Sequence, residues 1–382
     1  MVHLPISGDV NSLTLFASML SGTLRAWPED MDPSDAVTEA VEHGVAPLLA
    51  RRIGREPQRW PAAFVEGLDR ALRGEVALAA IRERAITAVL DALTAGGVRA
   101  LVIKGAHLAH TVYESAYLRP RRDTDLLIAE TDQERTREIL ERSGDTYVPH
   151  VSGSLVMPQF HYRREDRSGV ADQLDVHWRL TVPQAFDALP LLDELWERST
   201  PISALGPAAR APSLADALLI ACVHQAAHHS DGCALKWIVD VQRLAERLSV
   251  REAESFVERA TRARVCAVAG RPLSLAHDLL GARLTPPLHS LANEPVGNDE
   301  LSAAYLSPVG SVRGLTLDLR ALHGWSARTR LLREHLFPPR AYMRAYAPHT
   351  RWPMPALYFR RIVHGAARWL AAATTTRAAG SG

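Results

Sequence analysis

The sequence predicts an α+β protein in which a block of short strands and helices is flanked by N-terminal helices and followed by a C-terminal helical domain. Apolar residues recur at helical spacing before residue 95, short β-branched runs follow, and helical spacing returns after residue 213. The expected divisions are a helical region at 1–74, an α/β core at 75–205, a helical domain at 210–373 and a flexible tail at 374–382.

Composition restricts the class of protein. The chain has 382 residues, 47% hydrophobic and 23% charged, so it is long enough to bury a large core. Its net charge of +1 provides no overall field that would recruit nucleic acid or an anionic membrane. Three cysteines are typical of a reducing compartment. With no signal peptide and no membrane-length apolar run in the sequence, we expect a cytoplasmic protein.

The region before residue 95 is expected to be helical. Phe16, Met19 and Leu20 recur at helical spacing near the N-terminus. A longer pattern covers residues 62–93 and stops at a glycine pair, which suits the C-terminal end of a helix. We therefore predict a long helix over this range.

The middle of the chain, about 75–200, is expected to mix strands and helices. A capping box of Thr131 and Glu134 predicts the start of a helix that ends near Ser143. The last two strands flank a polar turn at 166–169, which favours a hairpin. The strands are predicted at residues 98–103, 123–128, 157–164 and 174–180.

The remainder of the chain is expected to be helical. Residues 201–212 are rich in Pro, Ala and Gly and indicate a linker. Ser213 and Asp216 then form an N-cap signature. The helical pattern continues to about residue 373, with breaks near 281–287, 293–298 and 337–339.

A pair of carboxylates carries the clearest chemistry. Asp123 and Asp125 are two residues apart on a predicted strand, so their side chains share one face. Two adjacent carboxylates repel each other unless a cation lies between them, and Mg²⁺ binds carboxylates together with substrate phosphates. Chance also produces this spacing, as it does at Asp30 and Asp32 in a proline-flanked loop. The context of the first pair favours a metal–nucleotide site there.

Three neighbouring features support this interpretation. Lys104 and Gly105 form a strand-to-helix turn whose backbone N–H groups suit a phosphate, although a plain tight turn explains them equally well. Asp175 and His177 share one face of a later strand, where Asp175 is able to complete a three-carboxylate set. Arginines before the first aspartates are placed to bind a triphosphate or to form a solvated loop, namely Arg119, Arg121 and Arg122.

Together these segments resemble the uncharacterised nucleotidyltransferase family of the DNA polymerase β-like superfamily. The resemblance covers about residues 75–345 in order and implies a small mixed sheet with a nucleotide site at the strand ends. It implies Asp123 and Asp125 as metal ligands and Asp175 as the third carboxylate. It rests on Lys104, Gly105, Ala106, Tyr113, Arg119 and the segments 122–128, 174–180, 218–229, 235–240, 337–339 and 343–344.

The function expected from these residues and this resemblance is nucleotidyl transfer. Mg²⁺ or Mn²⁺ would be held by the three aspartates, and an NMP would move from an NTP, such as ATP, to a hydroxyl or phosphate acceptor with release of pyrophosphate. The acceptor is a small molecule, a peptide or an RNA end. The expected nucleotide-binding residues are Lys104, Gly105, Arg119, Arg122, His177 and Lys236.

Other interpretations remain open. The fold is also compatible with a catalytically silent binding partner in a toxin–antitoxin or peptide-modification pathway. His224 and His228 have the i, i+4 spacing of a zinc helix, with Cys222, His229 and Cys233 nearby, but Gln225 replaces the glutamate of a zinc protease. No membrane partner is expected, and nucleic acid is only weakly supported. A basic stripe on the last helix suits a solvated face better than RNA or an acidic partner, and comprises Arg360, Arg361, His364 and Arg368.

Overall fold

The computed structural model describes residues 10–24, 26–165, 169–228, 234–294 and 299–365, and has the expected α+β architecture with a small mixed sheet. Within these ranges, five strands form one sheet in the order β1-β2-β5-β4-β3. Strand β2 runs parallel to β5, and the other neighbours are antiparallel. The strands are β1 (Ala100–Ile103), β2 (Asp123–Ile128), β3 (Thr146–Val148), β4 (Gln159–Glu165) and β5 (Ala171–His177).

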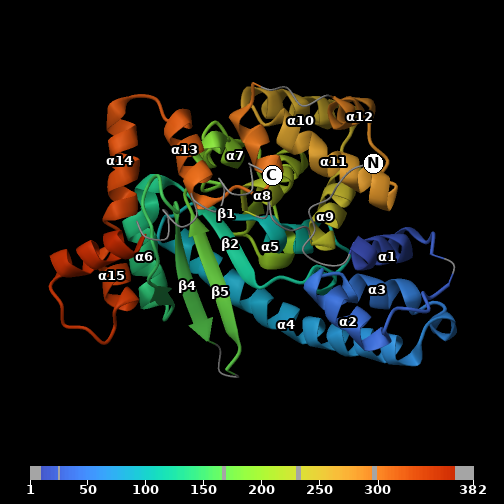
Figure 1. Ribbon diagram of the computed structural model, residues 1–382. Helices are drawn as coiled ribbons and strands as arrows, with labels where there is room; N and C mark the ends of the chain where they lie inside the picture. The colour runs from blue at the N-terminus through green and yellow to red at the C-terminus, as the bar shows by residue number, and fades with distance from the viewer. Residues whose placement is uncertain (1–9, 25, 166–168, 229–233, 295–298, 366–382) are drawn as a thin grey trace, which may run out of the picture.

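The N-terminal part is helical, as predicted, and ends in one long helix. Gly96 and Gly97 follow this helix, and Gly97 adopts φ +74°, the left-handed conformation that commonly ends helices. The long helix α4 runs under the sheet in Figure 1, with α1 to α3 beside its first half. These helices are α1 (Val10–Ser21), α2 (Pro33–Glu42), α3 (Ala46–Ile53) and α4 (Ala62–Ala95).

The two faces of the sheet have different surroundings. Ile86 and Leu93 from α4, with Leu140 from α6 (Gln133–Arg142), pack on one face together with alternate strand residues such as Leu126 and Val176. The opposite face packs partly against α5 (Lys104–Thr111) and the C-terminal helices, and otherwise carries polar side chains. Because side chains alternate along a strand, the same two strands bury apolar side chains on one face and present polar side chains on the other.

Several local predictions need correction. The capping box of Thr131 and Glu134 is absent, because a 3₁₀ turn precedes α6 and Asp132 stands at its N-cap without a side-chain hydrogen bond. The short strand β3 was not predicted. Residues 166–168, in the predicted hairpin turn, lie outside the described residues, although β4 and β5 do pair antiparallel.

The segment predicted as a linker is folded against the core. It forms a two-stranded ribbon, β6 (Thr200–Pro201) with β7 (Arg210–Ala211), and β7 packs beside β1. Ile202, Leu205 and Ala209 within it are buried. Pro, Ala and Gly here serve close packing and turns, so composition alone was a poor guide. The Ser213 cap was predicted correctly, because Ser213 Oγ accepts a hydrogen bond from the Asp216 backbone N–H at 3.3 Å.

The C-terminal part is helical with breaks where the sequence predicted them. None of the described helices is long and apolar enough to cross a membrane. The last part of the predicted helical domain, 366–373, and the predicted tail at 374–382 lie outside the described residues. The helices are α8 (Leu214–His228), α9 (Leu235–Ala245), α10 (Val250–Arg262), α11 (Cys266–Leu280), α12 (Pro286–Asn293), α13 (Ser311–Ala321), α14 (Trp325–Leu336) and α15 (Arg340–Tyr346), after the short α7 (Leu192–Glu197).

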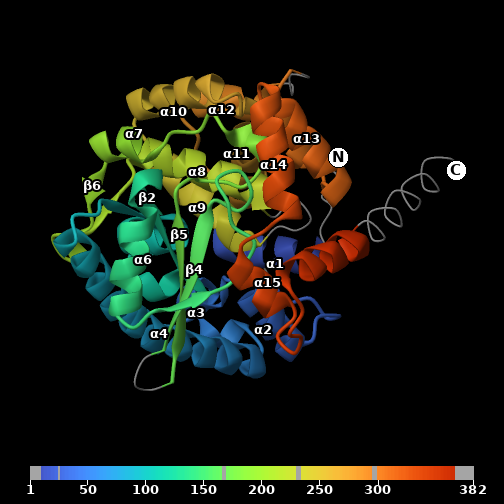
Figure 2. The same ribbon diagram turned by 90° about the vertical axis from the view of Figure 1, so that its left-hand side faces the viewer.

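The arrangement of these parts defines the surroundings of the sheet. In Figure 1 helices α13 to α15 lie on the side away from α1 to α3, and α8 to α12 lie above the sheet. Figure 2 views the molecule from the α14 and α15 side. One buried apolar cluster joins the N-terminal helices, the α5 side of the sheet and the C-terminal helices, and α4 continues unbroken across residue 75. The proposed domain boundaries therefore remain a prediction.

Candidate active site

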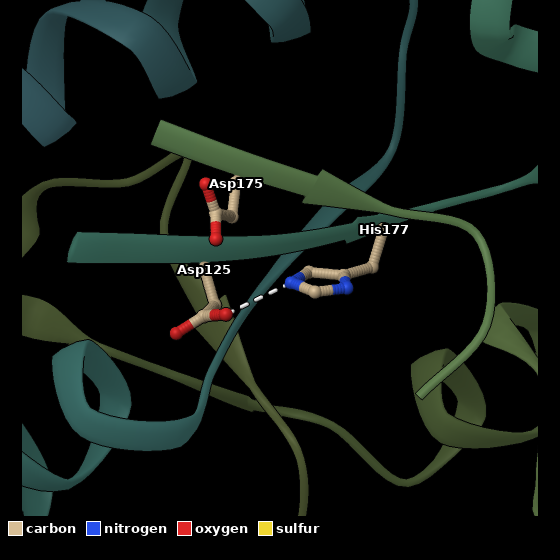
Figure 3. Close-up of side chains that lie close together, drawn as sticks. All are labelled: Asp125, Asp175 and His177. Carbon is tan, nitrogen blue, oxygen red and sulfur yellow. Dashed lines mark hydrogen bonds and ion pairs between the residues drawn. The ribbon is translucent and has the colours of Figure 1, made fainter. Parts of the chain in front are cut away.

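Parallel pairing of β2 and β5 brings the key carboxylates together. The register places Asp125 opposite Asp175, and Asp123 opposite Gln173 one pair earlier. His177 follows Asp175 by two residues, so its imidazole shares the same face of the sheet. Figure 3 shows Asp125, Asp175 and His177 on these adjacent strands. Their potential ligand atoms all lie within 4.8 Å of one another, the only such metal-compatible group among the described residues.

Lys104 links Asp125 and His177. Its Nζ lies 2.7 Å from Asp125 Oδ1 and 3.3 Å from His177 Nε2, while the same imidazole nitrogen lies 2.8 Å from that oxygen. All three side chains are nearly enclosed, with 11%, 5% and 3% exposure respectively. The Lys104 backbone has φ +53°, which residues other than glycine rarely adopt and which recurs at functional sites. This turn from β1 into α5 aims the ammonium group at the carboxylates.

Asp175 has its own supporting side chains on β4. Its Oδ1 lies 2.7 Å from His161 Nδ1, and the other His161 nitrogen lies 3.0 Å from Gln159 Nε2. The antiparallel register of β4 and β5 places His161 directly opposite Asp175. The carboxylate therefore has a fixed orientation on the polar face, with its side chain 14% exposed.

The charges at the site strongly perturb its acid groups. Burial, and then the negative charges of Asp125 and Asp175, raise the pKa of Asp123 to about 6. Burial alone would also raise the pKa of Asp125, but the Lys104 ammonium and the His177 hydrogen bond hold it well below its usual range. Burial, followed by Lys104, lowers the pKa of His177. A cation bound beside Asp123 would therefore favour the ionised form of this carboxylate.

Arg119 is held in a buried network rather than left open to solvent. Its guanidinium forms a fork on Asp240, with Nε–Oδ1 at 2.7 Å and Nη2–Oδ2 at 2.6 Å, and Tyr113 Oη donates to the same Asp240 Oδ1 at 2.7 Å. Its Nη1 donates to the Pro120 carbonyl at 2.7 Å. Arg119 borders the cavity but its charge is already paired, so this geometry favours positioning over direct phosphate binding. A Cβ at Gly105 would sit 3.6 Å from this guanidinium.

Lys236 brings a second ammonium group to the site from α9. Burial, followed by the positive charge of Arg119, lowers the pKa of Lys236 to about 8. Its side chain passes over Gly44, where a Cβ would lie only 2.4 Å from Lys236 Cδ. Gly44 therefore keeps open the path along which this lysine reaches the cavity.

All nine residues predicted for the site line one cavity of about 810 Å³. Its walls come from α2, α4, the sheet, α5, α8 and α9, so the N-terminal and C-terminal helices both close it. A cavity of this size accommodates a nucleotide with space for a second small group. The predicted residues that meet there are Lys104, Gly105, Arg119, Arg122, Asp123, Asp125, Asp175, His177 and Lys236.

The structure adds residues that the sequence reasoning missed. Gln159 lines the cavity and His161 orients Asp175; both lie on one face of the strand predicted at 157–164, so alternation was a usable signal. Asp240 lies within the segment 235–240 that resembles the family, but its bond to Arg119 spans 121 residues and has no local signal. Arg82 from α4 also lines the cavity and ion-pairs with Asp172 at 3.7 Å.

The zinc alternative gains no support from the described residues. His224 lines the cavity, but the metal-compatible group is the one on the sheet. Cys222 is fully buried, and burial raises the pKa of its thiol, which disfavours the thiolate that zinc binds. His229 and Cys233 lie outside the described residues, and so does Arg368 of the predicted basic stripe.

Comparison with known proteins agrees with this geometry. A family model described as an uncharacterised nucleotidyltransferase matches residues 29–281, which is more than half of the chain. The match begins upstream of the resemblance at residue 75 and includes the strands, α8 and α9. It ends before 337–344, so the resemblance of that stretch remains a prediction. No curated protein matches the chain.

Proposed function

We propose that this chain, which belongs to the uncharacterised nucleotidyltransferase family, transfers an NMP from an NTP to an acceptor hydroxyl or phosphate and releases pyrophosphate. The sheet would be the polymerase β-like core of that reaction. The pairing of Asp125 with Asp175 on parallel strands, with Asp123 on the same face of the cavity, is the observation that carries the proposal.

The residues present fit a divalent cation. Three carboxylates supply the oxygen ligands that Mg²⁺ and Mn²⁺ prefer, and burial followed by the negative charges of Asp125 and Asp175 raises the pKa of Asp123. Asp123, Asp125 and Asp175 would hold the ion or ions, with His177 hydrogen-bonded to Asp125. When bound, the ion would neutralise triphosphate charge and favour ionisation of the acceptor.

Cationic side chains around the carboxylates would bind the phosphates. Lys104 at the start of α5 and Lys236 on α9 line the same cavity, and Arg122 is exposed at its edge. As the bond between the α-phosphorus and its bridging oxygen breaks, negative charge grows on the departing pyrophosphate. Positive groups fixed in a partly enclosed site stabilise that charge more than they stabilise the bound NTP.

Asp175 is placed to act on the acceptor. Its hydrogen bond to His161 fixes the carboxylate, and it stands beside Asp125 rather than against Lys104. In the proposed step the acceptor oxygen bonds to the α-phosphorus while its proton passes to the Asp175 carboxylate and then to water. The products of this step are the acceptor carrying the NMP, pyrophosphate and one proton.

A nucleotide screen tests the binding half of this proposal. Thermal unfolding would be followed with ATP, GTP, CTP and UTP, each with and without Mg²⁺ or Mn²⁺. A ligand at about 100 times its Kd adds about 2.7 kcal/mol of stability. We expect a metal-dependent shift for at least one NTP, lost in Asp123→Asn/Asp125→Asn and retained in the control Asp69→Asn/Asp91→Asn, whose carboxylates are exposed on α4.

Product analysis tests the transfer half. The purified chain, the selected NTP carrying a label in its α-phosphate and candidate acceptors would be assayed for pyrophosphate and labelled product. Metal-dependent release that Asp175→Asn abolishes supports the reaction. Specific NTP binding with no release for any acceptor would instead favour the silent binding partner, and absence of both would overturn the proposal.

A further inference from the structure

The last helices form a strongly basic segment, here called the C-terminal arm (residues 311–365). It contains ten arginines but only Asp318 and Glu334 as acidic residues, so its net charge is +8 with histidines neutral. The whole chain is +1, which leaves the rest at −7. The near-zero total thus hides a separation of charge, and the arm creates a local positive field. It lies outside the matched residues 29–281.

The arm also carries exposed aromatic rings. Among the residues that the structure describes, all five aromatic side chains with large exposure belong to it: Trp325 at 80%, Phe359 at 70%, Phe337 at 52%, Trp352 at 47% and Tyr346 at 39%. Exposure of aromatic rings to water is unfavourable compared with their burial. Their concentration in one segment therefore indicates a binding surface. They arise from α14, α15 and the segments that follow, rather than from one face of a single helix.

The arginines of the arm are interleaved with these rings and mostly unneutralised. The guanidinium of Arg328 lies 5.8 Å from the Trp325 ring centre, and that of Arg360 lies 5.6 Å from Trp352. Within the described ranges, the single ion pair of an arm arginine joins Arg330 to Glu334. Positive charge and stacking surfaces therefore alternate over the arm, which is the pattern of single-stranded nucleic acid sites.

A groove between α13 and α14 gives this pattern a specific place. Its volume is about 320 Å³, and Arg320, Trp325, Arg328 and Leu332 are among its lining residues. Leu319 and Leu332 supply apolar walls, the guanidinium of Arg328 lies beside the exposed indole, and Arg320 lines the same groove. A planar base is able to stack on the indole with its phosphate next to an arginine.

We propose that the C-terminal arm binds single-stranded nucleic acid, with bases stacking on Trp325 and on the other exposed rings of the arm and phosphates paired with the arm arginines. Guanidinium groups beside rings suit bases and phosphates together. An anionic membrane would be favoured by apolar side chains gathered on one helix face, whereas these rings are distributed over several segments. The proposal rests on the arm and holds whether or not the cavity transfers nucleotides.

Binding would be measured by fluorescence anisotropy on the full chain with labelled RNA and DNA strands of about 20 nucleotides, longer than the ~4–16 nucleotides that such sites span. We expect saturable binding that weakens with NaCl, because each phosphate contact contributes about −0.7 to the slope of log K against log salt. Trp325→Ala should weaken binding about fivefold to hundredfold. Arg333→Gln/Arg340→Gln/Arg351→Gln should weaken it and reduce the salt slope.

Matched variants separate the arm from general charge. Arg55→Gln/Arg70→Gln/Arg73→Gln removes the same charge from exposed positions outside the arm and should leave the affinity within about twofold. Asp123→Asn/Asp125→Asn should also bind the strands normally, which keeps this test distinct from that of the cavity. Equal loss in the control, tighter binding to duplex than to single strands, or binding to anionic vesicles but not to oligonucleotides would overturn the proposal.

Discussion

At the scale of single residues, the lysines are the most informative feature of this molecule. Of 44 cationic residues, 42 are arginine, and the two lysines are Lys104 and Lys236. Both line the cavity. Arginine is a planar, permanently charged fork, whereas lysine is a compact point charge that loses its proton when buried. Both lysines of a chain that otherwise uses arginine thus lie in the cavity, where a smaller cation that is able to titrate would differ most from a guanidinium.

Replacing Lys104 by arginine should be damaging although the charge is kept. The Lys104 ammonium fits between Asp125 Oδ1 and His177 Nε2 in an enclosed position, and the larger guanidinium has no matching space. We expect kcat for NMP transfer to fall about 100-fold in Lys104→Arg, as for loss of one charge-stabilising group. Steady-state kinetics measure it, with Arg70→Lys, at an exposed position of α4 that does not line the cavity, as the control. Near-normal kcat in Lys104→Arg would remove the special role of this ammonium.

Lys236 should make NTP binding depend on pH. Its pKa is about 8, so it is protonated below that pH and progressively neutral above it. A bound triphosphate favours the charged form, hence affinity should be highest below pH 8 and fall as pH rises beyond it. The second ionisation of a phosphate, at about pH 6, is complete in this range. Calorimetric titration between about pH 7 and pH 9.5 should show this fall in the wild type and a flatter profile in Lys236→Arg. Identical profiles would exclude Lys236 from phosphate binding.

The sequence identified most of these residues because their chemistry is local. The spacing of Asp123 and Asp125 alone predicts that they share one face of a strand, and Asp175 and His177 have the same spacing. What spacing does not give is the parallel register that sets Asp125 against Asp175. Nor does it show that Arg119 is already paired, because its partner is 121 residues away. Contacts between residues so far apart in the sequence depend on tertiary packing rather than on local conformational preference.

At the scale of elements, the buried fork of Arg119 and Asp240 joins α9 to the segment before β2. Both side chains are nearly inaccessible, at 6% and 4% exposure. In this environment the charge of one partner requires the other, since an unpaired buried charge is costly. Arg243 also lies 4.5 Å over the ring of Tyr113, which donates to the same Asp240. This network fixes the C-terminal helices relative to β2.

Removing the negative member of this fork should destabilise the whole chain. Asp240→Asn retains the shape of the side chain but leaves the Arg119 guanidinium buried without its counter-charge, which costs about 3–5 kcal/mol. Tyr113→Phe removes only one hydrogen bond to the carboxylate, worth about 1.5–3 kcal/mol. Urea unfolding followed by near-UV circular dichroism compares them. If Asp240→Asn were no less stable than Tyr113→Phe, the fork would not be the connection described.

Helices were easier to predict than sheet edges for a physical reason. The long α4 and the breaks after α11, α12 and α14 follow from periodicity and from Pro or Gly, which act within a few residues. Strand β3 has three residues and little alternation, so its place at the sheet edge depends on pairing with β4. The ribbon of β6 and β7 was similarly hidden, because its proline and glycine content is also that of an open linker.

At the scale of the whole molecule, the cavity lies where all three parts of the chain meet. Its lining includes Val41 from α2, Asp125 from the sheet and Trp237 from α9. The large apolar cluster crosses the same divisions, since Ile103 and Leu108 pack within it alongside residues of the N-terminal and C-terminal helices. A site enclosed in this way needs every part in place, and the α/β core alone would expose apolar surface that the surrounding helices cover.

The core should therefore fail to fold by itself. A fragment of residues 75–209 would expose the α5 side of the sheet and lose most of the large apolar cluster, whose burial is the main source of stability. Near-UV circular dichroism and calorimetry should show no cooperative transition for this fragment. A chain ending at residue 310 keeps both major clusters and loses mainly the separate small clusters of the C-terminal arm, so it should still unfold cooperatively. A sharp transition in the 75–209 fragment would instead establish the α/β core as an autonomous domain. The surrounding helices would then shape its cavity without being needed for the stability of its fold.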